Sequence, residues 1–199
     1  MIRFIGDVHG KIADYRMVRK AATCSIQVGD MGIGFVRNPA LIADGHMFIR
    51  GNHDNPAECR ARADHLGEYG ITTLGSIWVF YVAGGYSRDQ DMRTLGRDYW
   101  SDEEISYQEL QKAIDLYAEE KPKVVVSHEA PISTVHAMGF RADSTRTNEA
   151  LEAMLKIHQP QYWIYGHYHL DFREQLGKTM FIGLAELSHF DLKKTDVKE

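Results

Sequence analysis

Short apolar runs, each followed by a small polar cluster, recur along this chain. Four of the runs predict buried strands, at residues 2–5, 47–50, 124–126 and 162–165, and a fifth run covers residues 25–28. Longer amphipathic segments alternate with them, and this pattern is typical of a sheet covered by helices. Loops that leave the carboxyl ends of strands in such a sheet converge on one crevice, so we expect the five clusters to lie together.

The clusters hold the side chains that bind divalent cations through oxygen and nitrogen. Asp7 and His9 are two residues apart on one loop, so both can turn to the same ion, and Asp30 could bridge two ions with its two oxygens. The seven candidate metal ligands are Asp7, His9, Asp30, Asn52, His128, His167 and His169. Such a set suffices for two divalent ions about 3.5–4 Å apart, with positions left for water and substrate.

The absence of thiolate from this ligand set narrows the choice of metal. Mixed oxygen and nitrogen ligands suit manganese, iron or zinc, and they differ from the cysteine-rich ligands of a structural zinc site. We therefore expect two divalent metal ions, with manganese as the first choice and iron, zinc, nickel, cobalt and magnesium as the other candidates.

Composition places the chain among ordinary globular proteins. It has 199 residues, 44% of them hydrophobic and 26% charged, so we expect a single domain over residues 1–199. A formal net charge of -5 gives no overall basic excess for nucleic acid or an anionic membrane. No apolar run approaches the ~20 residues that span a bilayer, and no secretory signal is visible, so we expect a cytoplasmic location. Cys24 and Cys59 are predicted to be buried thiols.

Periodicity and turn signals predict the remaining elements. Helices are expected over residues 11–22, 56–65 and 147–158. A capping box of the form Ser-x-x-Glu at residues 101–104 predicts the start of a further helix that ends near residue 120. Residues 71–82 predict a hairpin that begins a second, antiparallel sheet, and the tail from 171 to 192 predicts a returning hairpin that completes it. Residues 84–100 form a long polar loop, and loops of this length are often functional.

The motifs, taken in order, resemble the calcineurin-like metallophosphoesterase superfamily. They are Asp-x-His, Gly-Asp, Gly-Asn-His-Asp, a strand that ends in His128, and Gly-His-x-His, and they extend over residues 6–169. The resemblance implies an α/β fold, a four-layer α/β/β/α sandwich of two mixed sheets flanked by helices. It also implies that one metal would bind Asp7, His9, Asp30 and His169, and the other Asp30, Asn52, His128 and His167.

The same resemblance implies a reaction and two catalytic residues. A metal-bridging hydroxide would attack the phosphorus of a phosphate monoester or diester in line, without a covalent enzyme intermediate. His53 is similar to the group that protonates the leaving oxygen or stabilises the transition state in this family. Asp54 would orient His53, because a carboxylate beside an imidazole raises its pKa and fixes its tautomer.

Two arginines are candidates for binding the substrate phosphate. Arg50 resembles the phosphate-binding arginine that precedes the Gly-Asn-His motif in serine/threonine protein phosphatases. Arg93 is our first choice within residues 84–100, a loop that we expect to fold over the metals. Arg88 and Arg97 are evenly balanced between contact with the substrate and exposure to solvent.

The expected partner is a phosphate-ester substrate, and three alternatives to a general phosphoesterase are open. A serine/threonine-type protein phosphatase is the runner-up. It is placed second because the Gly-Asp motif at residues 29–30 is not followed by the further aspartate and arginine of those enzymes. A nuclease or nucleotide phosphodiesterase would need a basic groove, which the net charge disfavours. A non-catalytic scaffold is disfavoured because the apparent ligands and His53 are all present, although a fold does not settle function. The oligomeric state is left open.

Overall fold

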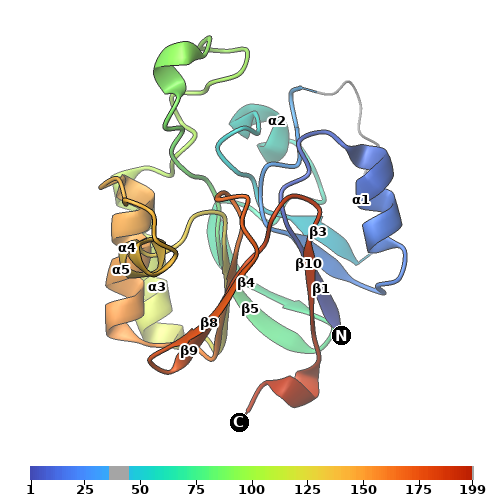
Figure 1. The fold of residues 1–199 in the computed structure, drawn as a ribbon, viewed down its shortest axis with the longest axis vertical. Coiled ribbons are helices and arrows are strands. Elements are labelled where there is room, and N and C mark those ends of the chain that lie inside the picture. Colours follow the sequence, from blue (N-terminus) through green and yellow to red (C-terminus); the bar gives the residue numbers. More distant parts are fainter. Residues whose placement is uncertain (36–44, 199) are drawn as a thin grey trace.

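The protein is described by a computed structural model that covers residues 1–35 and 45–198. Its strands form two mixed sheets (Figure 1). The first sheet has the order β10-β1-β2-β3 and consists of β1 (Ile2–Ile5), β2 (Ser25–Gln27), β3 (His46–Phe48) and β10 (His189–Leu192). In this sheet β1, β2 and β3 are parallel, and β10 is antiparallel to β1 with Leu192 opposite Ile2.

The second sheet has the order β4-β5-β6-β7-β9-β8. Its strands are β4 (Tyr69–Leu74), β5 (Ile77–Val82), β6 (Val124–Ser127), β7 (Tyr162–Tyr165), β8 (Phe172–Leu176) and β9 (Thr179–Gly183). The predicted hairpin is confirmed, since β4 pairs with β5 and Leu74 lies opposite Ile77. The prediction of an antiparallel sheet is wrong, because β5, β6, β7 and β9 are parallel. Helical crossovers join β5 to β6 and β6 to β7, and such connections link parallel strands.

Five α-helices are present in the described ranges: α1 (Ile12–Arg19), α2 (Pro56–Arg60), α3 (Tyr107–Glu120), α4 (Ile132–Ala137) and α5 (Arg146–Ile157). Short 3-10 helices occupy Gln90–Met92 and Lys194–Asp196. Helix α2 is shorter than predicted because the backbone of Asp64 and Leu66 pairs with Phe48, at the end of β3. Helix α4 has no counterpart among the sequence predictions.

Alternate side chains of the second sheet enter two different cores, and this arrangement produces the layers. Val79 and Val126 pack with the first sheet. Phe80 and Val125, their neighbours in sequence, pack with α3 and α5. The opposite face of the first sheet is covered by α1 and α2, with Tyr15 in that third core. The layers are therefore helices, sheet, sheet and helices, which confirms the predicted four-layer α/β/β/α sandwich (Figure 1).

The predicted capping box at residues 101–104 is wrong. Helix α3 begins at Tyr107, and the N-cap is Ser106, whose side-chain oxygen accepts a hydrogen bond from the Glu109 backbone N–H at 3.3 Å. The sequence therefore repeats the Ser-x-x-Glu pattern, and the second copy caps the helix. Glu103 and Glu104 are buried instead of lying in a solvent-exposed first turn.

The C-terminal tail contributes to both sheets. Strands β8 and β9 form the predicted hairpin at one edge of the second sheet. Strand β10 then returns to the first sheet and covers the edge of β1, so the prediction that the whole tail completes the second sheet is wrong. An exposed edge strand carries unpaired N–H and C=O groups, and pairing with β10 satisfies those of β1.

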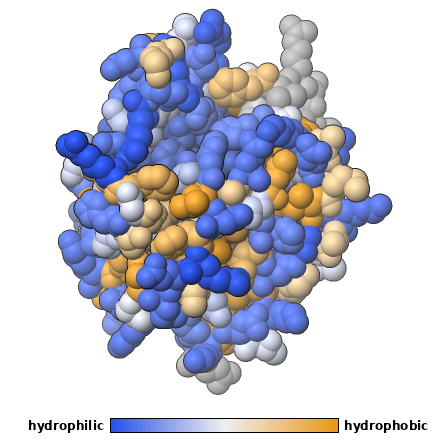
Figure 2. Space-filling model, in the orientation of Figure 1, coloured by the Kyte–Doolittle hydropathy of each residue, from blue (hydrophilic) through white to orange (hydrophobic). Residues whose placement is uncertain are grey.

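Polar surface dominates the upper part of the molecule in Figure 2, around the short helix Gln90–Met92, and apolar side chains gather lower down. Among the helices of residues 1–35 and 45–198, none combines the length and apolarity needed to cross a bilayer. Cys24 and Cys59 are buried free thiols, as predicted.

Candidate active site

The seven predicted ligands lie beyond the carboxyl ends of strands in both sheets. Asp7, Asp30 and Asn52 follow β1, β2 and β3, His128 follows β6, and His167 and His169 follow β7. The two sheets pack face to face, so these loops meet along one edge of the sandwich. The expected convergence is confirmed by contacts between residues that are far apart in the sequence, such as Asp7 with His169 and Asn52 with His128.

Asp7, His9 and His169 form the first group. The Nε2 atoms of His9 and His169 are 3.0 Å apart, and His169 Nε2 is 3.1 Å from Asp7 Oδ2. Asp7 Oδ2 is buried and has no partner among the described residues that meets hydrogen-bond geometry. A buried carboxylate oxygen without a hydrogen bond is costly. The group therefore fits a cation, which would satisfy this oxygen and both ring nitrogens.

Asn52, His128 and His167 form the second group. The Nδ1–H of His128 donates to the Val28 carbonyl oxygen at 2.9 Å, which turns Nε2 towards Asn52 Oδ1, also at 2.9 Å. His167 Nδ1 lies 3.0 Å from the same oxygen. A carbonyl oxygen and a neutral ring nitrogen both present lone pairs, so a proton or a cation must lie between them. Fixing of one ring nitrogen by a backbone carbonyl is the usual support of a metal-binding histidine.

Asp30 lies between the two groups. Its Oδ1 is 3.5 Å from His128 Nε2, and its Oδ2 is 3.8 Å from His53 Nε2. Burial favours the neutral carboxyl, but the neighbouring imidazoles, His128 first, hold the pKa of Asp30 well below its usual range. Burial likewise opposes a charge on His128, yet Asp30 raises the pKa of His128 to about 10. The Asp30 carboxylate therefore favours a positive charge at this position.

Strained backbone is concentrated in the ligand loops. Seven non-glycine residues in the described ranges have positive φ, and four of them are predicted ligands: His9 at 47°, Asp30 at 59°, His167 at 67° and His169 at 51°. Such conformations cost of order 1–3 kcal/mol each and persist where the surrounding structure imposes them, often at functional sites. The fold thus holds these four side chains in positions that the isolated loops would not prefer.

Two motif glycines allow the ligands to approach closely. A Cβ atom on Gly51 would lie 2.0 Å from Asp30 Oδ1, and one on Gly166 would lie 2.3 Å from Asp7 Oδ1. Both distances are shorter than any stable contact between these atoms. The glycines beside the ligands are therefore required by packing.

His53 and Arg93 border a cavity of about 310 Å³ that also contains Asn52 and His167 in its lining. Arg93 Nη2 is 3.1 Å from His53 Nε2, and its Nη1 contacts His53 Nδ1. An ion pair with Asp89, 2.7 Å from Arg93 Nε, fixes the guanidinium. Burial lowers the pKa of His53, with Asp30 opposing this effect and Arg93 adding to it. The loop of residues 84–100 thus brings an arginine to the ligand groups.

Comparison with known proteins agrees with this geometry. The family model for calcineurin-like phosphoesterases matches residues 1–171. The chain belongs to this family. Calcineurin-like phosphoesterases are metal-dependent hydrolases, and the described residues include two compact groups that could hold an ion: Asp7 with His9 and His169, and Asp7 with Asp30 and His128.

Solved structures share the fold of this calcineurin-like phosphoesterase at low sequence identity. A dimetal phosphatase from Danio rerio matches with a TM-score of 0.54 and 13% identity, over 94% of this chain and 88% of that one. The phosphopantetheinyl hydrolase of Mycobacterium tuberculosis gives 0.51 and 10%, over 93% and 89%. A putative 5′-nucleotidase from Staphylococcus aureus gives 0.51 and 14%, over 94% of this chain and 49% of that one. No curated protein matches the chain.

Asp54 does not orient His53 in this phosphoesterase, so that prediction is wrong. Its buried carboxylate accepts hydrogen bonds from the backbone N–H groups of Met31, Gly32, Ile33 and Gly51, at 2.7–3.1 Å. Burial and the nearby Asp30 charge raise the pKa of Asp54, while these amides oppose the rise. The side chain therefore ties the loop after β2 to the loop after β3.

Arg50 is also placed differently from its predicted role in phosphate binding. Its side chain is only 1% exposed, and its Nη2 is 2.7 Å from Glu68 Oε2. Another guanidinium nitrogen donates to the Glu103 carbonyl oxygen. A guanidinium held in this way is part of the core and does not line the cavity that contains His53 and Arg93. The feature that most resembled a protein phosphatase is therefore structural.

Ser87 and Glu103 support the site, although neither is among the site residues that the sequence motifs predict. The Asn52 Nδ2 donates to Ser87 Oγ at 2.9 Å, and the Ser87 hydroxyl donates to Glu103 Oε2 at 2.7 Å. Glu103 Oε1 accepts from the Ser87 backbone N–H, also at 2.7 Å. This chain fixes the Asn52 amide so that Oδ1 faces His128 and His167. The available signal was the position of Ser87 just after Gly84 and Gly85, which follow the end of β5.

Proposed function

We propose that this calcineurin-like phosphoesterase hydrolyses phosphate monoesters or diesters with two divalent metal ions, manganese first. The observation that carries the proposal is the convergence of two ligand groups on either side of Asp30, one with an unsatisfied buried carboxylate oxygen on Asp7. One ion would be held by Asp7, His9, Asp30 and His169, and the other by Asp30, Asn52, His128 and His167. Manganese accepts such mixed oxygen and nitrogen ligands without thiolate.

The protein supplies position and charge to the reaction. Two divalent ions bound by these ligands would activate water and polarise the phosphate. We call the cavity of about 310 Å³ that is lined by His53 and Arg93 the catalytic cavity. His53, with 23% of its side chain exposed, would stabilise or protonate the leaving oxygen there. Arg93 would hold a phosphate oxygen, because a guanidinium forms strong charge-assisted hydrogen bonds with phosphate.

The test is a screen of the purified protein, without metal and with Mn²⁺, against an aryl phosphate monoester and an aryl phosphate diester. Asp30→Asn and His53→Ala are the test variants. Asp115→Asn and His189→Ala are matched controls, because both residues are exposed and lie outside the site. We expect hydrolysis to require added metal and to fall at least about 100-fold in each test variant.

The outcomes separate the proposed enzyme from its alternatives. Metal analysis should give two ions per wild-type chain, and fewer in Asp30→Asn. Hydrolysis that survives Asp30→Asn would refute the dinuclear mechanism. Inactivity on both esters, with Mn²⁺ and then with iron, zinc, nickel, cobalt and magnesium in its place, would favour a non-catalytic scaffold.

A further inference from the structure

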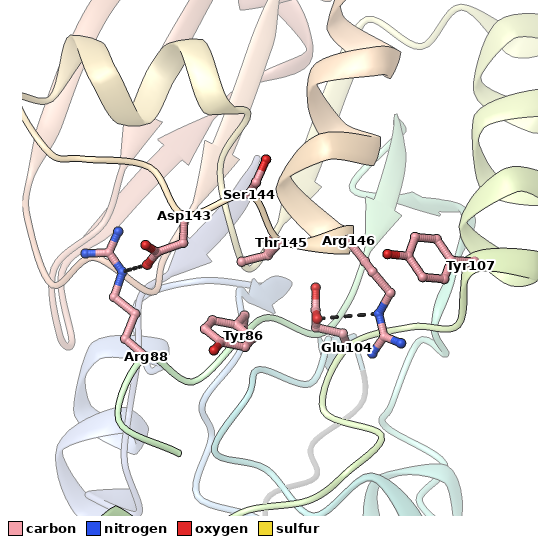
Figure 3. Close-up of a pocket in the computed structure, with 8 residues that line it drawn as sticks. All are labelled: Tyr86, Arg88, Glu104, Tyr107, Asp143, Ser144, Thr145 and Arg146. Atoms are coloured by element: carbon pink, nitrogen blue, oxygen red, sulfur yellow. Dashed lines mark ion pairs between the residues drawn. The ribbon is translucent and has the colours of Figure 1, made fainter. Parts of the chain in front are cut away.

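A second cavity, of about 510 Å³, lies next to the catalytic one; we call it the side cavity (Figure 3). Tyr86 and Arg88 contribute to its lining from the loop of residues 84–100. Glu104 and Tyr107 enter it from the start of α3, and Asp143 and Arg146 from the start of α5. The side cavity is therefore formed by loop residues and by the first residues of two helices.

Arg88 joins the two cavities, because it lines both the side cavity and the catalytic cavity that contains Asn52 and His53. A third cavity, of only about 10 Å³, shares Tyr86 and Arg88 with the lining of the side cavity, and Arg88, His167 and Tyr168 with the lining of the catalytic cavity. His167 belongs to the second ligand group. A substrate whose phosphate is held at the ligands would therefore extend past the Arg88 side chain to reach the side cavity.

The charges of the side cavity are balanced. Arg88 Nε is 2.6 Å from Asp143 Oδ2, and Arg146 Nε is 3.4 Å from Glu104 Oε2. In the view of Figure 3 the Tyr86 ring lies between these two ion pairs. A second phosphate here would be attracted by two guanidiniums and repelled by two carboxylates. The attraction and the repulsion oppose each other, so the side cavity does not favour a phosphate. The lining instead suits an uncharged polar group that both donates and accepts hydrogen bonds.

Two tyrosines give the side cavity flat aromatic surfaces. Tyr107 is 70% exposed, and the Arg146 guanidinium carbon lies 5.4 Å from the centre of its ring. The Tyr86 hydroxyl is held by a hydrogen bond with Gln90 Nε2. Tyrosine rings stack on planar heterocycles and leave the edges of the heterocycle free for hydrogen bonds. The aromatic surfaces and the charge balance together favour a flat, uncharged heterocycle.

We propose that the side cavity binds the nucleoside portion of a nucleotide ester whose phosphate is hydrolysed at the ligand groups. This proposal rests on the proposed phosphoesterase function and narrows its substrate class. A sugar shares the polarity of a nucleoside but lacks its flat ring, so a glycosyl phosphate ester is the competing substrate.

Three p-nitrophenyl diesters test the proposal: the esters of thymidine 5′-phosphate, methyl phosphate and glucose 1-phosphate, each measured with Mn²⁺. We expect kcat/KM for the thymidine ester to exceed that for the methyl and glucosyl esters by at least about 10-fold. In Tyr107→Ala the ratio of kcat/KM for the thymidine ester to kcat/KM for the methyl ester should fall at least about 5-fold. Trp78→Ala is the matched control, because it removes another exposed aromatic side chain that does not line the side cavity.

Equal rates with the thymidine and methyl esters, or preference for the glucosyl ester, would overturn the proposal. So would an equal effect of Tyr107→Ala on all three esters. Binding of thymidine 5′-phosphate and of inorganic phosphate, compared by calorimetry, does not require turnover. If no ester is hydrolysed but the nucleotide binds at least about 10-fold more tightly and loses this advantage in Tyr107→Ala, the phosphoesterase function fails and the nucleoside site stands. Equal binding of both ligands would overturn the nucleoside site.

Discussion

Replacing Glu103 by glutamine is expected to weaken metal binding through the Asn52 amide. In the native site the Glu103 carboxylate accepts two hydrogen bonds from Ser87, so the Ser87 oxygen is free to accept from Asn52 Nδ2. Glutamine has one acceptor and one NH₂ group. When the glutamine oxygen accepts from the Ser87 N–H, the glutamine NH₂ group donates to the Ser87 hydroxyl oxygen. The Ser87 hydroxyl proton then points to Asn52. The Asn52 amide is driven to turn, which would place NH₂ where the metal needs an oxygen.

The structure sets the size of this effect. The lost contact is a buried hydrogen bond to an ionised carboxylate, and such bonds contribute about 1.5–3 kcal/mol. At about 1.4 kcal/mol per factor of ten, the affinity for the ion at Asn52 should fall about 10- to 100-fold. This agrees with the general cost of removing a group that orients a metal ligand.

Calorimetric titration of the metal-free protein with Mn²⁺ measures the loss. Burial raises the pKa of Glu103 to about 7, so the titration belongs at about pH 8.5, where the carboxylate is ionised. We expect one of two binding steps to weaken in Glu103→Gln and the other to stay within about 3-fold.

Ser87→Ala and Asp64→Asn complete the experiment. Ser87→Ala removes the intermediate hydroxyl and should weaken the same step. Asp64→Asn removes another buried carboxylate, which is paired with Arg62, and should leave both steps unchanged. Wild-type affinity for both ions in Glu103→Gln and Ser87→Ala would show that Glu103 and Ser87 do not orient the Asn52 amide.

Three further predictions follow from contacts in the site and the first sheet. Gly51→Ala should displace Asp30, lower the free energy of unfolding by about 1–3 kcal/mol and reduce the bound metal, so an intact two-ion stoichiometry would contradict it. Arg93→Ala should lower kcat/KM for aryl phosphates about 10- to 100-fold, and unchanged kinetic constants on every ester would exclude its contact with phosphate. A hydrogen bond from Arg3 holds the pKa of Asp191 below its usual range, so this stabilisation is present above about pH 4 and is lost as the pH falls further. Urea unfolding of Asp191→Asn should show a loss of about 1 kcal/mol at neutral pH and none near pH 2, and an equal loss at both would contradict the ion pair.

The sequence predicted the elements whose signal is local. The apolar runs of β1, β6 and β7 and the motifs after them lie within a few residues of each other, so both strand and ligand could be recognised together. The two copies of Ser-x-x-Glu show the limit of such signals. Ser101 and Ser106 offer the same local capping chemistry, and only the burial of Glu103 in the site decides between them.

The errors concern groups whose role depends on partners that are distant in sequence. The neighbours of Arg50 in the motif predict that it binds phosphate, but its role is set by Glu68 and by the backbone of Glu103. Asp54 was expected to act on the adjacent His53, whereas three of its four backbone partners lie in the loop after β2. No local pattern encodes these contacts, because they arise only when the parallel strands bring the loops together.

The pairing of β10 with β1 has a consequence for the order in which the protein can be completed during synthesis. The loop that contains Asp7 is held by backbone hydrogen bonds from the tail, from Gly6 N–H to the Ser188 carbonyl and from Leu187 N–H to the Asp7 carbonyl, both at 2.9 Å. The residues of this loop precede in the sequence those that hold it, so they leave the ribosome earlier. Contacts between such distant segments form late and slowly. The first ligand loop must therefore wait, with its strand edge open, until β10 has been made.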